Sequence, residues 1–428
     1  MKAGLRSVAA IAISLVLVAG CTAEPERELP DGDADRETES PSATSPSAGV
    51  DGVTVTGVPG AIGRIALLDE LGTLVAFDAD GSDVDVLAES VPGASLVRQP
   101  TWSPDGARLA WVRLDADGTS AALVTTTGAG TGTTETRTAA TPFYLFWDPT
   151  SSRIAYLGSS AEADIELGIV DVVGGDGAVA LDSGSPFYLS WDPTGEQMLV
   201  HVGTDRLERL AIDGTLTTVH DRPGTFNAPV WTSDGRSLLY ASDSEGGQRL
   251  VAHDLDADRR EDLVRFDGAI TFVVSPDGSR VAFQVLRAPD DVAPLSVLDR
   301  ATGAIERVAT GFVPAFFWSP EGDKLLHLLP EVAPDRVWFR WGVWDGESSF
   351  STPRFYPSLV FGRDYLQFFE QYAQSMSLWA PDGSAFVYAG SSEAGETGVW
   401  IQQARSGTEP VLVANGVFAT WSPATKRR

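Results

Sequence analysis

The chain carries a repeated pattern of apolar and polar positions that predicts short antiparallel strands. One unit begins with a polar turn, Trp102–Gly106 (Trp-Ser-Pro-Asp-Gly), and continues with apolar residues two apart at Leu109 and Trp111. Apolar residues at this spacing indicate a strand with one face in a core. Because proline fixes φ, aspartate bonds its own backbone and glycine accepts a positive φ, the polar segment indicates a tight turn. Each unit therefore predicts a strand, a turn and a second strand.

Eight such units follow one another. Their first residues, which we call the anchors, are Trp102, Trp147, Trp191, Trp231, Val274, Trp318, Trp379 and Trp421. The anchors are 45, 44, 40, 43, 44, 61 and 42 residues apart, and a period in the low forties is what one four-stranded propeller blade requires. We therefore expect an all-β fold, a single closed β-propeller of eight four-stranded blades, with seven as the alternative if one weak repeat is irregular. Each tryptophan anchor should pack between neighbouring blades, where its truncation would cost about 3–5 kcal/mol.

The last repeat lacks its own second strand. Only seven residues follow Trp421, whereas Gly63–Leu68, near the start of the repeat region, fits the missing strand. Arg64 also matches the basic residue that follows the turn in other repeats, at Arg108, Arg153, Arg280 and Lys324. Residues 60–90 should therefore supply the outer strands of the blade whose inner strand is the last one, which closes the ring and leaves no long exposed edge.

These repeats resemble the WD40-like (PD40) repeats of the TolB propeller family over about residues 60–428. The turn motif with Leu-Ala-Trp or Val-Ala-Phe behind it carries the resemblance, as does Phe77–Ser82 (Phe-Asp-Ala-Asp-Gly-Ser), which is similar to a strand-end turn of that family. The resemblance implies the fold and not the function, because such propellers serve as scaffolds, transport partners and peptidase caps. TolB itself resembles a six-bladed ring preceded by a small α/β domain. Residues 22–59 cannot form that domain, so a TolB-like role in outer-membrane energetics does not carry over.

The first 20 residues are typical of a bacterial lipoprotein signal peptide. Lys2 and Arg6 precede an apolar run, Val8–Gly20, that is shorter than the roughly 20 residues a membrane-spanning helix needs. The run ends in a lipobox-like Leu-Val-Ala-Gly-Cys, so Cys21 is the expected site of lipidation. Cys21 is the only cysteine, and exported chains normally use cysteines in pairs. The alternative is an ordinary signal peptide with an incidental cysteine.

Residues 21–59 are expected to form a disordered tether. Eight acidic residues between Glu24 and Glu39, and a following stretch rich in Ser, Thr, Pro, Ala and Gly, leave almost nothing apolar to bury. This gives three parts: residues 1–20 as signal peptide, 21–59 as lipidated tether and 60–428 as propeller. The lipid should hold the protein on the outer face of the cytoplasmic membrane, or alternatively in the outer membrane or periplasm of a diderm.

The charge of the chain argues against nucleic acid as a partner. The chain has 31 basic and 59 acidic residues, for a net charge of −28, and its only basic run is Lys426–Arg428. A phosphate backbone requires clustered basic residues. We expect a monomer that is attached to the membrane through its lipid and binds no nucleic acid.

No set of residues indicates catalysis. There is no Gly-x-Ser-x-Gly elbow, and His201, His220, His253 and His327 have no metal-ligand spacing. His327 occupies a core position, His201 is structural or solvent-facing, and the other two should be exposed. Acidic turns such as Asp78–Asp85 and Asp115–Asp117 do not fit an EF-hand, so we expect no cofactor beyond a weak calcium site.

An enzyme would need carboxylates on the inner strands, as in propeller hydrolases or lyases acting on glycans or lactones. The segments before three of the anchors, Phe143–Phe146, Phe187–Ser190 and Ala315–Phe317, are apolar. We therefore expect a non-enzymatic binding or scaffold module for an envelope protein or another envelope ligand.

One irregular stretch, residues 357–374, interrupts the repeats. Its aromatic residues follow a helical period, and this helix has two interpretations. It covers its own blade and buries the stripe, or it offers an aromatic surface for a peptide or glycan at the mouth of the ring, where inserted loops meet ligands. The candidate binding residues are Trp341, Trp344, Phe361, Arg363, Tyr365, Phe368, Phe369 and Tyr372.

Overall fold

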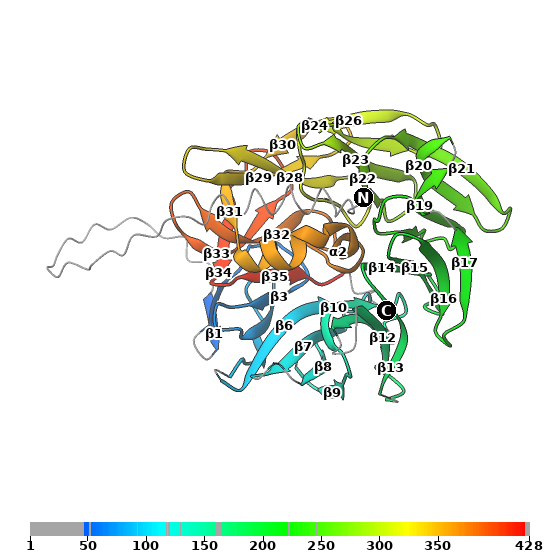
Figure 1. The fold of residues 1–428 in the computed structure, drawn as a ribbon. Helices are drawn as coiled ribbons and strands as arrows, with labels where there is room; N and C mark the ends of the chain where they lie inside the picture. The colour runs from blue at the N-terminus through cyan, green and yellow to red at the C-terminus, as the bar shows by residue number, and fades with distance from the viewer. Residues whose placement is uncertain are drawn as a thin grey trace, which may run out of the picture.

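The computed structural model describes residues 47–423, except for 51–52, 92, 117, 119, 129, 160–164, 176, 221–222 and 245. Cys21, the expected signal peptide and most of the expected tether lie outside these residues. The described chain forms antiparallel sheets arranged around a central axis, with a short helix, α2 (Phe369–Ser375), in the middle (Figure 1). This confirms the expected all-β propeller.

Six separate sheets each carry one anchor on their first strand. In five of them the strands follow chain order from the centre outward, and in the sixth the last strand of the chain, β35, precedes three strands from near the start of the repeat region. The strands, sheet by sheet, are β35 (Phe418–Trp421), β3 (Arg64–Leu68), β4 (Leu74–Asp78) and β5 (Asp85–Ala88); β6 (Ser95–Trp102), β7 (Arg108–Asp115), β8 (Ala121–Thr127) and β9 (Thr134–Arg137); β10 (Thr141–Trp147), β11 (Arg153–Ser159), β12 (Ile165–Asp171) and β13 (Ala178–Gly184); β14 (Phe187–Trp191), β15 (Gln197–Val202), β16 (Arg206–Ala211) and β17 (Leu216–His220); β18 (Val230–Trp231), β19 (Ser237–Ser244), β20 (Gly247–Asp254) and β21 (Arg259–Phe266); β22 (Ala269–Val274), β23 (Arg280–Ala288), β24 (Asp291–Val292), β25 (Leu295–Asp299) and β26 (Ile305–Ala309).

The repeats anchored at Trp318 and Trp379 share one eight-stranded sheet. A short strand between them, β31, pairs with β29 on one side and β32 on the other, so the two repeats are hydrogen-bonded to each other. Trp379 itself makes a single bridge, to Phe386. The strands of this sheet are β27 (Phe316–Trp318), β28 (Leu325–Val332), β29 (Val337–Trp344), β30 (Ser349–Ser351), β31 (Phe355–Pro357), β32 (Ala385–Ser392), β33 (Thr397–Gln403) and β34 (Val411–Ala414).

The two ends of the repeat region meet in one sheet. β35 pairs antiparallel with β3, in a register that places Trp421 opposite Ile65 and Phe418 opposite Leu68. Strands β4 and β5 then complete this sheet outward. This is the pairing that the shortened last repeat predicts.

The tryptophan anchors pack between neighbouring blades, as predicted. Trp147 is 2% exposed, and its indole Nε1 donates to the carbonyl oxygen of Thr101, the residue before the preceding anchor, at 3.2 Å. Four other anchors make the same kind of bond, from the indole Nε1 to a backbone carbonyl oxygen of the preceding blade. They are Trp102, Trp191, Trp318 and Trp379. Each of these side chains therefore joins two blades by packing and by a hydrogen bond to the backbone of the other blade.

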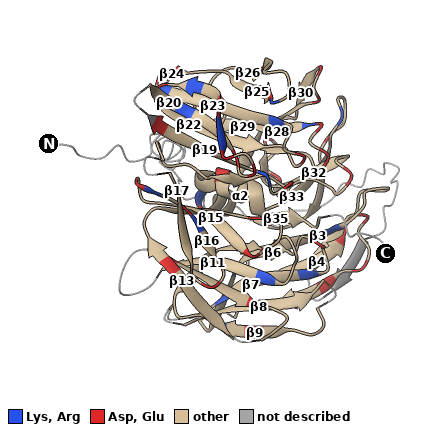
Figure 2. Ribbon diagram, turned by 90° about the vertical axis from the view of Figure 1, so that its right-hand side faces the viewer, with Lys and Arg blue, Asp and Glu red and all other residues tan. Residues whose placement is uncertain are grey.

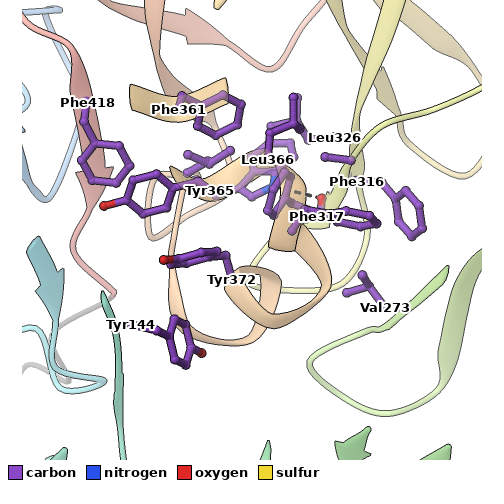
Figure 3. Close-up of a cluster of buried hydrophobic side chains, with 14 of the residues drawn as sticks. Tyr144, Val273, Phe316, Phe317, Leu326, Phe361, Tyr365, Leu366, Tyr372 and Phe418 are labelled. Atoms are coloured by element: carbon purple, nitrogen blue, oxygen red, sulfur yellow. Dashed lines mark hydrogen bonds between the residues drawn. The ribbon is translucent and has the colours of Figure 1, made fainter. Parts of the chain in front are cut away.

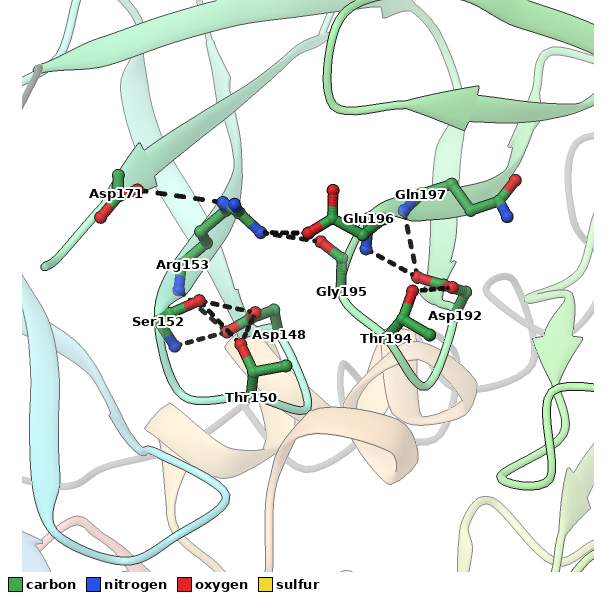
Figure 4. Close-up of polar contacts among 10 residues, drawn as sticks. All are labelled: Asp148, Thr150, Ser152, Arg153, Asp171, Asp192, Thr194, Gly195, Glu196 and Gln197. Carbon is green, nitrogen blue, oxygen red and sulfur yellow. Dashed lines mark hydrogen bonds and ion pairs between the residues drawn. The ribbon is translucent and has the colours of Figure 1, made fainter. Parts of the chain in front are cut away.

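The repeated arginine after the turn also joins blades. Arg153 donates from Nη1 to the carbonyl oxygen of Gly195, in the turn of the next blade, at 3.1 Å and to the Glu196 carboxylate at 3.2 Å (Figure 4). Arg108 makes the corresponding bond to the carbonyl oxygen of Ser151. In these two repeats the basic residue is therefore a contact between successive turns, whereas Arg64 bonds to Ala76 and Asp85 of its own blade.

The folded region begins before residue 60, which corrects the expected boundary of the tether. Residues Ser47–Val50 and Val53–Thr56 form a hairpin, β1 and β2. Val55 and Val58 are buried in a cluster with Phe77 and Val413, and the alternating valines explain why this segment folds. None of the helices in the described part of the chain is long and apolar enough to cross a membrane.

Candidate binding site

The insert between β31 and the anchor Trp379 folds into three short helical turns. These are a π-helical turn (Phe361–Tyr365), a 3-10 turn (Leu366–Phe368) and α2. The helical period in the sequence is thus confirmed. The place of the helix is different from either expectation, because α2 lies at the centre of the ring (Figure 1).

Polar side chains of α2 bond to the inner strands of several blades. Gln371 binds the backbone of Leu189, accepting from its N–H and donating to its carbonyl oxygen, each at 2.8 Å. Gln371 also donates to the Tyr144 hydroxyl at 2.9 Å. On other sides of α2, Glu370 accepts from the N–H of Phe272 and Gln374 donates to the carbonyl oxygen of Pro229. The insert is therefore held by four different blades through these groups alone.

The aromatic stripe of the insert fills the centre. Tyr365 stacks on Phe418 with ring centroids 4.2 Å apart, Phe369 packs on Phe316 at 5.0 Å and Tyr372 meets the edge of Tyr144 at 5.0 Å. Figure 3 shows Tyr365 pointing from the insert toward Phe418 and Tyr372 pointing toward Tyr144, which belong to different blades. The insert is a plug bound to the whole ring, and not a cover over its own blade.

This burial corrects the expectation of an open aromatic surface. Six of the eight candidate residues belong to the core, namely Trp341, Trp344, Phe361, Tyr365, Phe369 and Tyr372. Arg363 and Phe368 are exposed. The stripe predicts a buried face, but the sequence does not say which surface covers that face.

A pocket of about 300 Å³ lies beside the plug. It is bounded by the insert and by the three blades anchored at Trp102, Trp147 and Trp191, and three of the predicted residues, Arg363, Phe368 and Tyr372, line it. The residues that sequence analysis did not select include Arg98, Gln99, Thr141, Phe143, Tyr144, Phe187, Tyr188, Phe226, Asp364 and Gln371.

One signal in the sequence marks part of this pocket. The tetrapeptide Pro-Phe-Tyr-Leu occurs twice, at 142–145 and 186–189, at the start of two successive inner strands. In both copies the proline, phenylalanine and tyrosine line the pocket. Phe143 is 39% exposed and Phe368 is 47% exposed, so two aromatic rings remain accessible from outside.

Gln99 lines the pocket and has an unusual backbone conformation. Its φ is 55°, at an irregularity in the pairing of β6 with β7, and its Oε1 accepts from the Tyr372 hydroxyl at 2.9 Å. A left-handed non-glycine residue is uncommon and is often found at functional sites. Here it links the inner strand to the plug at the point where the pocket forms.

The charges at the pocket are few. Arg363 forms a two-pronged ion pair with Asp364, at 2.6 and 3.0 Å. Arg98 is exposed, and no carboxylate in the described chain lies within ion-pair distance of its guanidinium. Basic residues elsewhere are scattered over the blades (Figure 2). The pocket is thus mainly apolar, with one arginine at its edge available to a ligand.

Glu370 is an acid on the central helix that sequence analysis missed. Its side chain is half-buried beside the inner strands, and removal from water raises the pKa of its carboxyl to about 8, against the opposing bond from the Phe272 N–H. Within the described residues, no lysine or arginine forms an ion pair with it. The carboxyl is therefore largely protonated at neutral pH.

The histidines are structural where the sequence predicts it. His327 is buried against Gly342 and His201 is buried beside Asn227, and burial lowers the pKa of both imidazoles to about 4. His253 is only 7% exposed and bonds to Asp258, which corrects the expectation of an exposed residue. Its place on β20 turns it inward.

The acidic turn considered for calcium uses its carboxylates internally. Asp80 accepts from the N–H and hydroxyl of Ser82, and Asp85 pairs with Arg64 at 2.8 Å. Asp117, from the second acidic turn, lies outside the described residues. In the part of the chain that the structure describes, no three His, Cys, Asp or Glu side chains are grouped to hold a metal ion.

The sheets around a common axis define a β-propeller, and comparison with known proteins agrees at the level of fold. No family model matches the chain, and no curated protein matches its sequence. A solved eukaryotic initiation factor is similar with a TM-score of 0.55 and 10% identity, over 85% of this chain and 99% of that one. A prolyl endopeptidase is similar with a TM-score of 0.52 and 13% identity, over 78% of this chain and 51% of that one.

TolB structures are also among the similar ones. TolB from Acinetobacter baumannii has a TM-score of 0.39 and 16% identity, over 69% of this chain and 64% of the TolB chain. The chain therefore spans less than two thirds of that protein. All of these likenesses concern the fold alone.

Proposed function

We propose that this protein is a lipid-anchored, extracytoplasmic propeller that binds a protein ligand at the pocket beside the plug, without catalysing a reaction. The observation that carries the proposal is the pocket itself. Aromatic rings from two successive Pro-Phe-Tyr-Leu strands and from the insert converge there, and Phe143 and Phe368 remain exposed. Concave, mostly apolar sites with a few polar groups are typical of ligand binding.

The chemistry of the walls favours a peptide segment over a glycan. A sugar ring carries hydroxyl groups that need partners, and the pocket supplies few polar groups that are free. Gln371 already uses its side-chain oxygen and nitrogen on Leu189 and Tyr144, and Arg363 is paired with Asp364. Apolar side chains of a protein need no such partners and gain by leaving water.

The alternative is a propeller hydrolase or lyase that acts on glycans or lactones. Such chemistry uses an acid and a base that face each other across the substrate. Glu370 could serve as an acid, but the groups the structure places around it are the Phe272 N–H and the Tyr188 phenol. Neither supplies a base at neutral pH, so binding is the better-supported function.

The location follows from Cys21. We infer a lipid on this thiol that holds the protein on the outer face of the cytoplasmic membrane. In cell fractionation, the variant C21S should leave the membrane fraction and be found in the medium or the soluble envelope fraction. Retention of this variant on membranes would contradict the anchor.

The binding function is tested by capture from native membranes. The tagged chain should retain a reproducible protein that the double variant F143A/F368A loses, because truncating both rings removes the exposed apolar walls of the pocket. Both rings are partly in water, so we expect this variant to stay folded, which its thermal unfolding would show.

The matched control for this capture is L359A. Leu359 is 73% exposed on the same insert and does not line the pocket, so its truncation removes a similar apolar group elsewhere. The proposal holds if L359A captures the protein as the wild type does. Equal capture by all three forms would place the ligand on another surface.

A further inference from the structure

We propose that the pocket binds the carboxyl-terminal end of a peptide, with an apolar last side chain between the aromatic walls and the terminal carboxylate paired with Arg98. This inference rests on the proposed function and specifies its ligand. It depends on three features of the pocket: its apolar walls, its single available guanidinium and the polar groups between them.

The walls fit an apolar side chain. Tyr188 and Phe226 stack face to face with centroids 4.5 Å apart, which fixes both rings as one surface of the pocket. Phe143 and Phe368 add rings that are partly in water. A volume of about 300 Å³ is at the small end of ligand sites and takes a chain end rather than a folded element.

Arg98 is suited to a carboxylate. It lies on β6 next to Gln99, lines the pocket and has no carboxylate partner in the described chain, whereas Arg363 is already held by Asp364. A guanidinium binds a carboxylate through two parallel hydrogen bonds. The net charge of −28 disfavours a general attraction of anions to the protein. Binding of the peptide carboxylate must therefore come from its local pair with the Arg98 guanidinium.

The remaining polar groups favour a peptide over an acyl chain. Thr141 and Gln99 lie on the walls, and Asp364 has acceptor capacity beyond its pair with Arg363. The amide groups of a peptide can bond to these side chains. A fatty acid offers a carboxylate but no amide groups, so it would make none of these additional bonds.

The test uses the full chain and matched probes. Four tripeptides, N-acetyl-Ala-Ala-X with X as Leu, Ile, Val or Phe, are compared as free acids and as carboxyl-terminal amides by titration calorimetry, with octanoate as the acyl arm. We expect at least one free acid to bind and its amide to bind tenfold more weakly or worse. In R98Q the acid should lose this advantage and bind like the amide.

The charge-matched control is R405Q, because Arg405 is exposed and lies outside the pocket. It should keep the wild-type preference for the acid. Equal binding of acid and amide to the wild type would overturn the role of the carboxylate, while leaving a pocket that binds peptides. Binding of octanoate alone would overturn the peptide.

If no probe binds, the inference fails. The capture experiment with F143A/F368A then decides the proposed function separately. If a protein is still captured through the pocket, the proposed function stands and the ligand is an internal peptide segment. If no probe binds and no protein is captured through the pocket, both the inference and the proposed function are wrong.

Discussion

At the scale of single residues, Glu370 gives the molecule a defined dependence on pH. Its carboxyl has a pKa of about 8 in the folded chain, because burial disfavours its charged form. In the unfolded chain the pKa of a glutamate is about 4.3. Between these values the folded state holds a proton that the unfolded state has released, so the free energy of unfolding falls as the pH rises through this window.

The variant E370Q should not show this fall in the free energy of unfolding as the pH rises. Glutamine keeps an oxygen that accepts from the Phe272 N–H but carries no charge, so the variant should match the wild type near pH 4.5 and become more stable than it toward pH 8. The difference should grow by at most about 1.4 kcal/mol per pH unit and level off above pH 8. Denaturant unfolding across this pH range measures it, and parallel curves for the two proteins would contradict a buried, protonated Glu370.

At the scale of elements, the sequence predicts what is local and repeated. The turn motif predicts the strands around it, and the spacing of the anchors predicts the sheets, because each repeat buries its tryptophan against the one before. Trp147 and its bond to Thr101 show the reason: the contact recurs between neighbours and leaves a period in the sequence. The pairing of β35 with β3 follows from the same regularity.

The insert and the pocket could be predicted only in part, because they depend on contacts that occur once. The spacing of Phe361, Tyr365 and Tyr372 predicts a helix with one buried face, but the rings that cover it come from strands on several blades. Arg98 and Glu370 follow no period at all. Their roles arise from the helix reaching the centre of the ring, which no local pattern encodes.

At the scale of the whole molecule, the plug joins blades that are not adjacent in the ring. The repeat contacts alone join only adjacent blades. Side chains of the plug bond to Leu189, Phe272 and Pro229 from different directions, and its rings pack in the core that runs through most of the ring. A propeller with an open channel would have no such crossing contacts. The plug also forms one wall of the pocket, so the shape of the proposed binding site depends on it.

The most direct test of this account is amide hydrogen exchange of the intact chain. If the insert is the centre of the ring, peptides covering residues 361–375 should exchange as slowly as those of the inner strands β10 and β14, because opening them requires breaking contacts with several blades at once. The exposed hairpin at residues 288–292 serves as the fast-exchanging reference. Exchange of the insert as fast as this hairpin would mean that the helix lies open on the surface, and the plug and the pocket beside it would both be wrong.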